Sequence, residues 1–550
     1  MRVLILGGYG AFGGRLAQLL AADGVDLIIA GRSLEKARAH CDRFGGEPVA
    51  IDRDGDLEAA FRAAAPDVVV DASGPFQTYG PDPYRVVRAC LAVGADYLDL
   101  ADGADFVAGI GALDAQARAA GRAVLSGLST LPALSFAAAR ALSADWDSVE
   151  SLETGIAPSP RVDFGLSVIA ATTSYAGSPV PLRRRGAGAS GVGLAETRRW
   201  TVGPPGGLPL RRILFALADA PDLRLAPVAW PELRNVWTGA GPSPGWALWL
   251  LTVLARLRSC GLAPSLKPLV GIFHAVINRL HGGEHRGGMI VQARGMQAGK
   301  AVGASWHLLA EGDDGPFIPA MAAAVVIGRM RAGKRPAPGA RAATAELELS
   351  DFQPFFDARA ITTGAWSALD STAPVFRQVL GGAFERLPPE VRALHAGRSD
   401  ETWAGTASVE RGEGWLVVLI CAAIGLPAAA AETQVNVRIA RKPGKETWRR
   451  TFGGRSFTSV LTVGRGARER LICERFGVMT VAMALVLKDR VLEFVVRDWS
   501  VLGVPMPRAV APLSTSHERE EAGRFVFDVE IGLPLIGRLV RYRGWLEPRS

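Results

Sequence analysis

Apolar and polar residues are arranged along the first 130 residues in blocks typical of a parallel sheet covered by helices. Short apolar runs lead into glycine-rich or polar turns, and amphipathic segments follow. The runs predict strands at 3–6, 25–30, 47–51, 67–71, 96–99 and 122–125, and the segments predict helices at 15–22, 34–44, 57–64, 83–93 and 106–119. This order predicts a Rossmann-type doubly wound α/β domain over 1–135, which binds ligands at the carboxyl ends of its strands.

The pattern changes after residue 135, where short apolar runs mix with glycine- and proline-rich segments. We predict an α+β domain over 136–366, with a linker or surface loop at 333–342. Within it, the apolar segments 245–257 and 266–280 are too short to span a bilayer. Two interpretations remain open for them. They form helices buried against a sheet or a subunit partner, or they lie in a membrane interface, which their tryptophans and flanking basic residues would suit.

Strand-like alternation dominates the C-terminal third. Runs at 434–441, 447–451, 457–463, 471–476, 481–488, 490–496, 524–531 and 539–546 predict strands, and 375–384 and 412–424 predict helices. We predict a β-rich domain over 370–550, mostly antiparallel with one or two covering helices, as a half-open barrel or cup.

The net charge and the cysteine content indicate which kinds of partner and cofactor to expect. The net charge is +8, but no basic stripe interleaved with aromatics appears, so we expect no nucleic-acid partner. The positive charge suits an anionic cofactor or an anionic membrane surface. Five scattered cysteines without a CxxC motif predict neither a disulfide framework nor a zinc site. The chain opens with a strand rather than a signal peptide, so we expect a cytoplasmic protein, with membrane association as the alternative.

The strongest motif is a glycine turn between the first strand and the first helix. Gly8 is expected to permit the tight turn, Gly10 to let the backbone approach a pyrophosphate, and Gly13 to let the helix pack closely. Ala11 and Phe12 complete the turn. The helix N-terminus faces the phosphates, so we predict a dinucleotide site.

The end of the second strand indicates which dinucleotide binds. Arg32 stands near the place where an NAD site usually has an acidic residue, and its guanidinium suits a 2′-phosphate. Ser33 is expected to donate a further hydrogen bond and to cap the next helix. We therefore predict NADP, the alternative being a solvated loop arginine. After the strand 67–71, the small residues Ser73, Gly74 and Pro75 are expected where the cofactor passes, or else form an ordinary turn.

These motifs together resemble the saccharopine dehydrogenase-like NADP-binding family. The resemblance rests on GGYGAFGGRLA, AGRSLEKA, VVDASGPFQTYG and VVRACLAVGADYLDL, with GLSTLP at the loop of the sixth strand. It implies a Rossmann domain, a second substrate or dimerisation domain, NADP(H) and often a homodimer.

One departure from the family pattern limits the chemistry. Members that act on saccharopine carry an aspartate in the loop matching Gly127–Pro132, whereas this chain has Ser129-Thr130-Leu131-Pro132. This difference argues against saccharopine as the substrate. Tyr79, Asp99 and Asp102 remain as candidate catalytic groups on neighbouring loops, with Asp99 or Asp102 as general acid or base. Asp99 could instead cap the next helix or accept from a backbone amide.

The histidine pattern does not predict a metal site. Residues 281–285 read HGGEH, formally a zinc-peptidase pattern, but two central glycines disfavour the helix it needs, so we predict a loop.

The C-terminal residues resemble an uncharacterised bacterial domain. The similarity lies in Trp448–Arg455, Glu474–Gly477 and Tyr542–Trp545, which mix arginines with aromatics around glycine turns. Either Arg455 or Arg543 contacts the acid group of an anionic amphiphile, or these arginines pair with Glu474 and Asp528.

Taken together, the sequence predicts an NADP-dependent oxidoreductase that transfers hydride to or from a carbonyl or imine of a small, lipid-like substrate. The alternative is a non-catalytic, membrane-peripheral NADP-binding scaffold or sensor. Peripheral membrane contact is assigned to 245–280, and a homodimer is expected.

Overall fold

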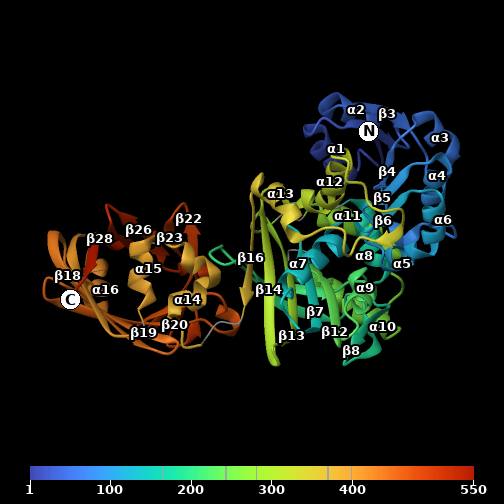
Figure 1. Cartoon of the computed structure of the whole chain (residues 1–550). Coiled ribbons are helices and arrows are strands. Elements are labelled where there is room, and N and C mark those ends of the chain that lie inside the picture. The colour runs from blue at the N-terminus through green and yellow to red at the C-terminus, as the bar shows by residue number, and fades with distance from the viewer. Residues whose placement is uncertain are drawn as a thin grey trace. The chain divides into compact units, whose positions relative to one another are not determined.

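The computed structural model describes residues 1–163, 165–241, 245–279, 282–367, 371–397, 399–534 and 536–549. The chain divides into two compact units, shown with their helices and strands in Figure 1. Unit 1 comprises Met1–Trp200 and Ile213–Thr363, and unit 2 comprises Thr201–Arg212 and Gly364–Ser550.

The N-terminal sheet of unit 1 has seven parallel strands in the order β15-β6-β5-β4-β1-β2-β3. The strands are β1 (Arg2–Leu6), β2 (Asp26–Gly31), β3 (Glu47–Ala50), β4 (Val68–Asp71), β5 (Asp96–Asp99), β6 (Ala123–Ser126) and β15 (Gly339–Ala342). The central strands are almost continuously apolar and buried, because helices cover both faces of a parallel sheet. The predicted doubly wound fold is confirmed.

The helices around this sheet are α1 (Gly13–Ala22), α2 (Leu34–Phe44), α3 (Leu57–Ala64), α4 (Arg85–Val93), α5 (Ala104–Gly109), α6 (Asp114–Ala119), α7 (Ser135–Leu142) and α12 (Ile318–Arg331). Four of these helices follow the predicted segments closely, whereas the helix predicted over 106–119 is divided into α5 and α6 by a 3₁₀ turn and α7 was not predicted. Ser33 is the N-cap of α2, as predicted, and its hydroxyl accepts from the Lys36 amide at 3.3 Å.

One strand of this sheet contradicts the prediction. The linker or loop predicted over 333–342 is wrong for its last four residues, because β15 pairs in parallel with β6. The Asp114 carboxylate accepts from the Ala340 amide at 2.9 Å and fixes the strand at the sheet edge. Its four residues include a glycine and an arginine, so the run carries little apolar signal. The chain therefore leaves this sheet after β6 and returns to it more than two hundred residues later.

A second sheet, most of whose residues belong to unit 1, is mixed and has the strand order β10-β11-β12-β7-β13-β14-β16. Its strands are β7 (Ser148–Ala157), β10 (Thr197–Val202), β11 (Leu210–Leu217), β12 (Asn235–Ala240), β13 (Arg286–Gln297), β14 (Lys300–Glu311) and β16 (Ile361–Ser367), and a separate hairpin joins β8 (Pro179–Arg184) and β9 (Ala187–Val192). Its helices are α8 (Leu166–Ser174), α9 (Asp222–Ala229), α10 (Gly245–Ser259), α11 (Val270–Ile277) and α13 (Gln353–Asp357). This is the α+β character predicted for the middle of the chain.

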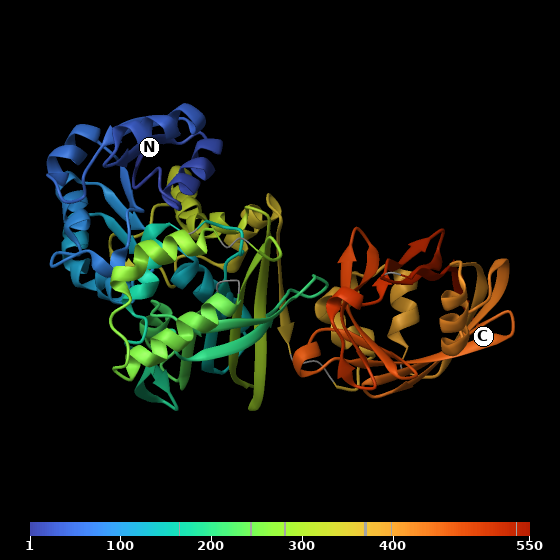
Figure 2. The same cartoon turned by 180° about the vertical axis from the view of Figure 1, so that it is seen from behind.

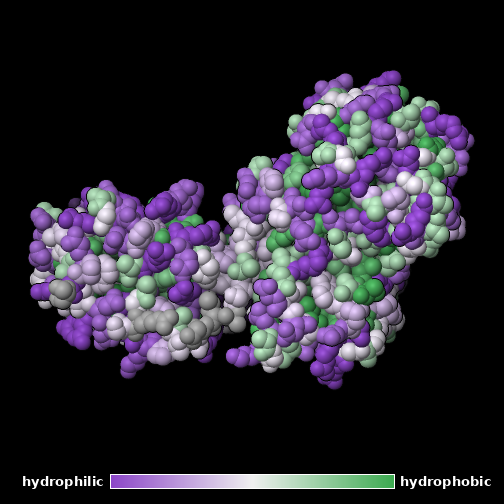
Figure 3. Space-filling model, in the orientation of Figure 1, coloured by the Kyte–Doolittle hydropathy of each residue, from purple (hydrophilic) through white to green (hydrophobic). Residues whose placement is uncertain are grey.

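The two apolar segments of this region form α10 and α11, which lie in front of the second sheet in Figure 2. Only Leu248, Thr252 and Ala255 of α10 are buried, and α11 has no buried residue. Trp246 and Trp249 are 56% and 60% exposed. Figure 3, in the orientation of Figure 1, shows the opposite face, where hydrophobic residues are interspersed with hydrophilic ones on the surface of unit 1. None of the helices within the described ranges combines the length and the apolar character that a membrane span requires.

Unit 2 contains a large antiparallel sheet in the order β22-β21-β20-β19-β18-β17-β28-β27-β26-β23-β24, with β25 paired to β27. A further pairing between β22 and β23 closes this sheet into a barrel. The strands are β17 (Glu401–Arg411), β18 (Ala430–Lys442), β19 (Lys445–Phe452), β20 (Arg455–Val463), β21 (Ile472–Phe476), β22 (Met479–Lys488), β23 (Val491–Val501), β24 (Val504–Pro505), β25 (Leu513–Ser514), β26 (Ser516–Glu521), β27 (Arg524–Leu533) and β28 (Gly537–Pro548). The β-rich antiparallel prediction is confirmed, and the half-open form is corrected to a closed ring.

The core of unit 2 joins the barrel strands to α14 (Val375–Leu380), α15 (Pro389–Ala396) and α16 (Trp415–Ile424). The helices contribute Phe376, Leu394 and Cys421 to the same apolar cluster as Phe457 and Phe525 of the strands. The sequence pattern misses α15 and β17. The β17 strand lies between β18 and β28, so the ring depends on it.

Candidate functional site

The turn after β1 brings three segments of the Rossmann sheet into close contact. Gly7 has a φ of +82°, and a Cβ there would lie 2.8 Å from the Ala72 carbonyl oxygen beyond β4. A Cβ on Gly13 would lie 2.3 Å from the Gly7 carbonyl oxygen. Helix α1 can therefore begin directly against the turn only because both positions are glycine. The positive φ belongs to Gly7, which the GxGxxG spacing does not single out.

The N-terminus of α1 is suited to an anion. Phe12 is the N-cap and gives no side-chain hydrogen bond, and the first turn has no acidic residue. The amides at this end are donors that the helix itself does not satisfy, and the helix dipole adds positive potential. Gly8, Gly10 and Ala11 form the turn leading to this end. These residues fit the pyrophosphate of a dinucleotide.

The adjacent turn after β2 is fixed by a residue that the sequence pattern does not reveal. The Ser33 amide donates to the Tyr9 hydroxyl at 2.9 Å, so Tyr9 ties the glycine turn to the Arg32–Ser33 turn. Its ring would lie 2.7 Å or less from a Cβ on Gly31. Arg32 itself is exposed. Its guanidinium is thus available beside the predicted phosphate site.

The loop after β4 contains a compact polar cluster. Asp71 is fully buried at the end of β4 and accepts from the Ser73 hydroxyl at 2.6 Å. The Tyr79 hydroxyl donates to both oxygens of Asp71 at 3.2 Å and lies 2.9 Å from the Ser73 hydroxyl. Arg53 stacks 3.9 Å from the centroid of the Tyr79 ring. The cluster uses the polar atoms of both Ser73 and Tyr79, while Gly74 and Pro75 lie between these two residues in the partly buried loop.

Burial sets the protonation of this cluster. It raises the pKa of Asp71 and that of Tyr79, because a charge is poorly solvated there. The Asp71 carboxylate raises the pKa of Tyr79 further. Tyr79 is therefore a neutral donor near neutral pH rather than a ready proton source.

Asp99 is enclosed at the end of β5. It is fully buried, and Oδ1 accepts from the Gly127 amide at 2.7 Å and from the Ala101 amide at 3.0 Å. Burial raises its pKa to about 7. These contacts join the end of β5 to the loop after β6, where Ser129 and Thr130 are also buried.

Asp102 differs from the other two candidate catalytic residues because it is exposed. Its Oδ1 accepts from the Gln77 side-chain amide at 3.1 Å. Gln77 belongs to a short 3₁₀ turn, Phe76–Thr78, which packs against α8 of the second sheet. Close by, Arg224 of α9 pairs with Asp105 at 3.2 Å. The carboxyl edge of the Rossmann sheet therefore meets helices of the predicted substrate domain beside Asp102.

Other predicted groups belong to unit 2. Arg543 pairs with Glu410 at 3.4 Å, and Arg455 is exposed. Arg450 pairs with Glu474 at 3.2 Å, and Arg541 pairs with Asp528 at 2.7 Å, so both acidic residues have arginine partners.

The structure describes residues 282–285 of the HGGEH segment, and His281 lies outside the described residues. His285 is 3.3 Å from Asp313. No group of three histidine, cysteine or acidic residues suited to a metal occurs in the part of the chain that the structure describes.

Solved structures resemble the chain only distantly. Saccharopine dehydrogenase (L-Glu forming) from Saccharomyces cerevisiae is 16% identical over 67% of this chain and 100% of its own, with a TM-score of 0.47. Biliverdin reductase from Synechocystis sp. PCC 6803 is 15% identical over 64% of this chain and 94% of its own, with a TM-score of 0.27. None of the curated proteins matches the chain. Structural likeness at this level carries no argument about activity.

The family models are more informative. Residues 387–546 match a domain of unknown function, DUF4166. Residues 3–125 match the saccharopine dehydrogenase NADP binding domain, which supports a nicotinamide dinucleotide as cofactor and an oxidoreductase as the class of protein. The chain therefore joins an N-terminal nucleotide-binding domain of the saccharopine dehydrogenase type to a C-terminal DUF4166 domain.

Proposed function

We propose that this protein is an NADP-dependent oxidoreductase acting on a carbonyl or imine group of a small, lipid-like molecule. The observation that carries the proposal is the uncapped N-terminus of α1, packed against a turn that excludes side chains and lying beside the exposed Arg32. A bound nicotinamide would supply hydride transfer. The protein would bind the phosphates with Gly8, Gly10 and the α1 amides.

Selectivity for NADP is assigned to the turn after β2. The Arg32 guanidinium would bind the 2′-phosphate through charge-assisted hydrogen bonds. Tyr9 would hold this turn in place through the Ser33 amide. Tyr9 would therefore position Arg32 without contacting the reacting atoms.

Proton transfer is assigned to Asp102. Its exposure beside α8 and α9 gives it access to a substrate, whereas Asp99 is enclosed and the Tyr79 hydroxyl is used by Asp71. Gln77 would orient the Asp102 carboxylate. Asp99 and Tyr79 would then support the loops, and Ser73, Gly74 and Pro75 would form the wall past which the cofactor extends.

Turnover is the direct test of this proposal. The protein would be mixed with NADPH and a library of carbonyl compounds and imines. Sustained loss of the nicotinamide absorbance band with one library member supports the enzyme. Tight NADPH binding without turnover across a broad library would favour the non-catalytic scaffold.

Peripheral membrane contact is a second proposal, favoured by the exposed apolar side of α10 and α11. Trp246, Trp249 and Leu250 are about half exposed or more, and Ile272 of α11 is 60% exposed. Interfacial helices present such side chains to the headgroup region, with basic residues nearby. Co-sedimentation with vesicles tests this contact. A homodimer remains a prediction, and light scattering of the purified protein tests it.

A further inference from the structure

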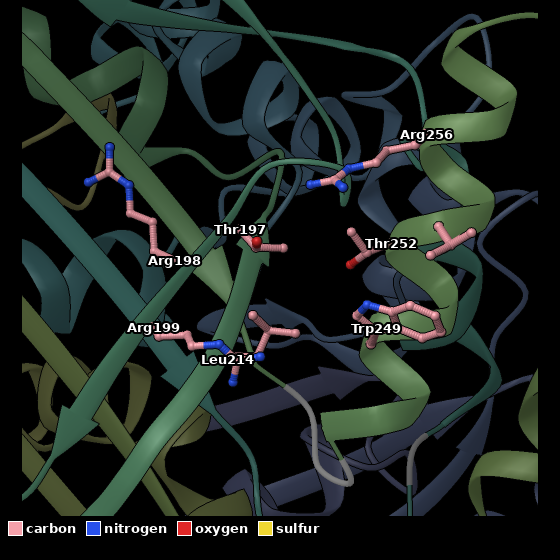
Figure 4. Close-up of a pocket in the computed structure, with 8 residues that line it drawn as sticks. Thr197, Arg198, Arg199, Leu214, Trp249, Thr252 and Arg256 are labelled. Atoms are coloured by element: carbon pink, nitrogen blue, oxygen red, sulfur yellow. The ribbon is translucent and has the colours of Figure 1, made fainter. Parts of the chain in front are cut away.

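A groove of about 350 Å³ lies in unit 1 between β10 and α10 (Figure 4). It is lined by Thr197, Arg198, Arg199, Leu214, Trp249, Thr252, Val253 and Arg256. No acidic residue lines it, so the positive charge of Arg199 and Arg256 is not neutralised within the groove. Its size is within the usual range for a site that binds a small ligand or a headgroup.

The arginines of the groove have different roles. Arg198 points away from the groove in Figure 4 and pairs with Glu153. Arg199 extends from β10 towards the space between strand and helix, and Arg256 extends over the same space from α10. Both are exposed, and the Arg256 Nε donates to the Ala195 carbonyl oxygen at 3.2 Å. Arg199 and Arg256 thus present two cations to one space.

A buried hydroxyl points to a polar ligand in the same place. Thr252 is only 4% exposed, and its Oγ1 has no hydrogen-bond partner among the described residues. Figure 4 shows this hydroxyl turned towards β10. An unsatisfied buried hydroxyl is costly, so a ligand oxygen at hydrogen-bond distance would remove a penalty that the protein alone leaves.

The groove also continues into an apolar surface. Trp249 lines it and is 60% exposed, and Trp246 and Leu250 lie on the same helix, 56% and 48% exposed. A ligand with its charge between Arg199 and Arg256 could therefore lay an apolar part along α10.

We propose that this groove binds the phosphate-bearing headgroup of an anionic lipid, with the acyl chains against the exposed side of α10. This inference rests on the membrane contact proposed above and is independent of the oxidoreductase activity. The arginines would bind the phosphate through charge-assisted hydrogen bonds, and the Thr252 hydroxyl would donate to one of its oxygens.

The test measures binding of the full-length protein to vesicles of phosphatidylcholine with and without phosphatidylglycerol. Arg199→Gln should weaken binding to the anionic vesicles about five- to tenfold, because it removes one cation at the membrane surface and its hydrogen bonds. The matched control, Arg62→Gln on α3, removes the same charge from an exposed site on the Rossmann sheet. It should change binding less than about twofold, since screening limits the reach of a distant charge.

Thr252→Val gives an independent readout. Valine replaces the unpartnered hydroxyl by a methyl group of similar size, so the thermal midpoint should rise or stay unchanged while vesicle binding weakens by about threefold or more. A variant that loses binding because it is unfolded would instead lose its thermal midpoint and its NADPH binding.

The outcomes separate the groove from the membrane contact. Equal effects of Arg199→Gln and Arg62→Gln would overturn the groove as a headgroup site. If Trp246→Ser still abolished vesicle binding, the membrane contact would stand without the groove. Saturable binding of glycerol phosphate in the absence of vesicle binding would also overturn the proposal, because the ligand would then be a free phosphate ester.

Discussion

The N-terminus of α1 and the ends of β4 and β5 lie at the same edge of the Rossmann sheet, but their polar groups differ in whether hydrogen bonds already satisfy them. At the N-terminus of α1 the donors are left open, with no side-chain cap and no acidic neighbour in the first turn. At the ends of β4 and β5, Asp71 and Asp99 are buried and already accept hydrogen bonds from their own loops. The first region has donors suited to an anion, whereas the acids of the second region hold their own loops, leaving Asp102 as the accessible acid.

The largest effect on NADPH affinity is expected where the turn excludes side chains. Gly13→Ala places a Cβ 2.3 Å from the Gly7 carbonyl oxygen, which displaces α1 from the turn. NADPH affinity should fall by about a hundredfold or more, measured by fluorescence titration, since phosphate ligation depends on this placement. Gly111→Ala is the control, because a Cβ there meets nothing within 4 Å. Unchanged affinity in Gly13→Ala would show that the phosphates bind elsewhere.

Asp102→Asn tests whether the accessible acid, rather than the buried Asp71 or Asp99, transfers the proton. If Asp102 transfers the proton, turnover should fall by roughly 10²- to 10⁴-fold, while NADPH affinity stays the same. Asparagine retains an oxygen for the Gln77 hydrogen bond, so the loop should be kept. Tyr79→Phe is the comparison, with a smaller loss of turnover and a loss of stability of about 1 kcal/mol for the missing hydrogen bonds. The reverse ranking would assign the chemistry to Tyr79.

The pH dependence of stability tests the buried acid at the end of β5. The pKa of Asp99 is about 7 in the folded protein and near 3.8 ordinarily, so the folded state keeps a proton that the unfolded state has lost. The Asp99 contribution to the free energy of unfolding therefore falls as pH rises between these values, by at most about 1.4 kcal/mol per pH unit. At pH values above both pKa values, the Asp99 contribution to the free energy of unfolding no longer changes with pH.

Asp99→Asn should remove this contribution. The asparagine Oδ1 can still accept from the Gly127 and Ala101 amides. Urea unfolding at about pH 5 and about pH 8 should then show a smaller difference in stability than for the parent. Asp222, whose pKa burial also raises to about 7, would keep its own share of the pH dependence. An identical pH dependence in parent and variant would contradict the raised pKa of Asp99.

Local sequence patterns predict most of the Rossmann sheet because most of its strands contain a short apolar run, as β1, β2 and β4 do. They do not predict β15, whose pairing with β6 joins residues distant in the chain. Barrel closure likewise depends on β22–β23 pairing along with the register of the remaining strands. Such long-range pairings leave no local periodicity.

The glycine turn and Arg32, the predicted cofactor site, can be identified from the sequence for a similar reason, since these residues are close in the chain. The residues that hold the neighbouring loops in place are harder to predict from the sequence. Tyr9 acts through a hydrogen bond to the Ser33 amide, and Asp71 is one charged residue at the end of an apolar strand. The charged end of that strand is the one signal that could have identified Asp71. Asp99 is buried because the loop after β6 packs over it. The sequence alone therefore does not show that Asp99 is enclosed while Asp102 is exposed.

The central claim is that the glycine turn and Arg32 form an NADP site. Calorimetric titration of NADPH and NADH into the parent and Arg32→Ala tests it most directly. The parent should bind NADPH more tightly than NADH. Arg32→Ala should lose roughly tenfold or more in NADPH affinity with little change for NADH, because only the 2′-phosphate contact is removed. Equal NADPH affinities in the parent and Arg32→Ala would contradict this assignment.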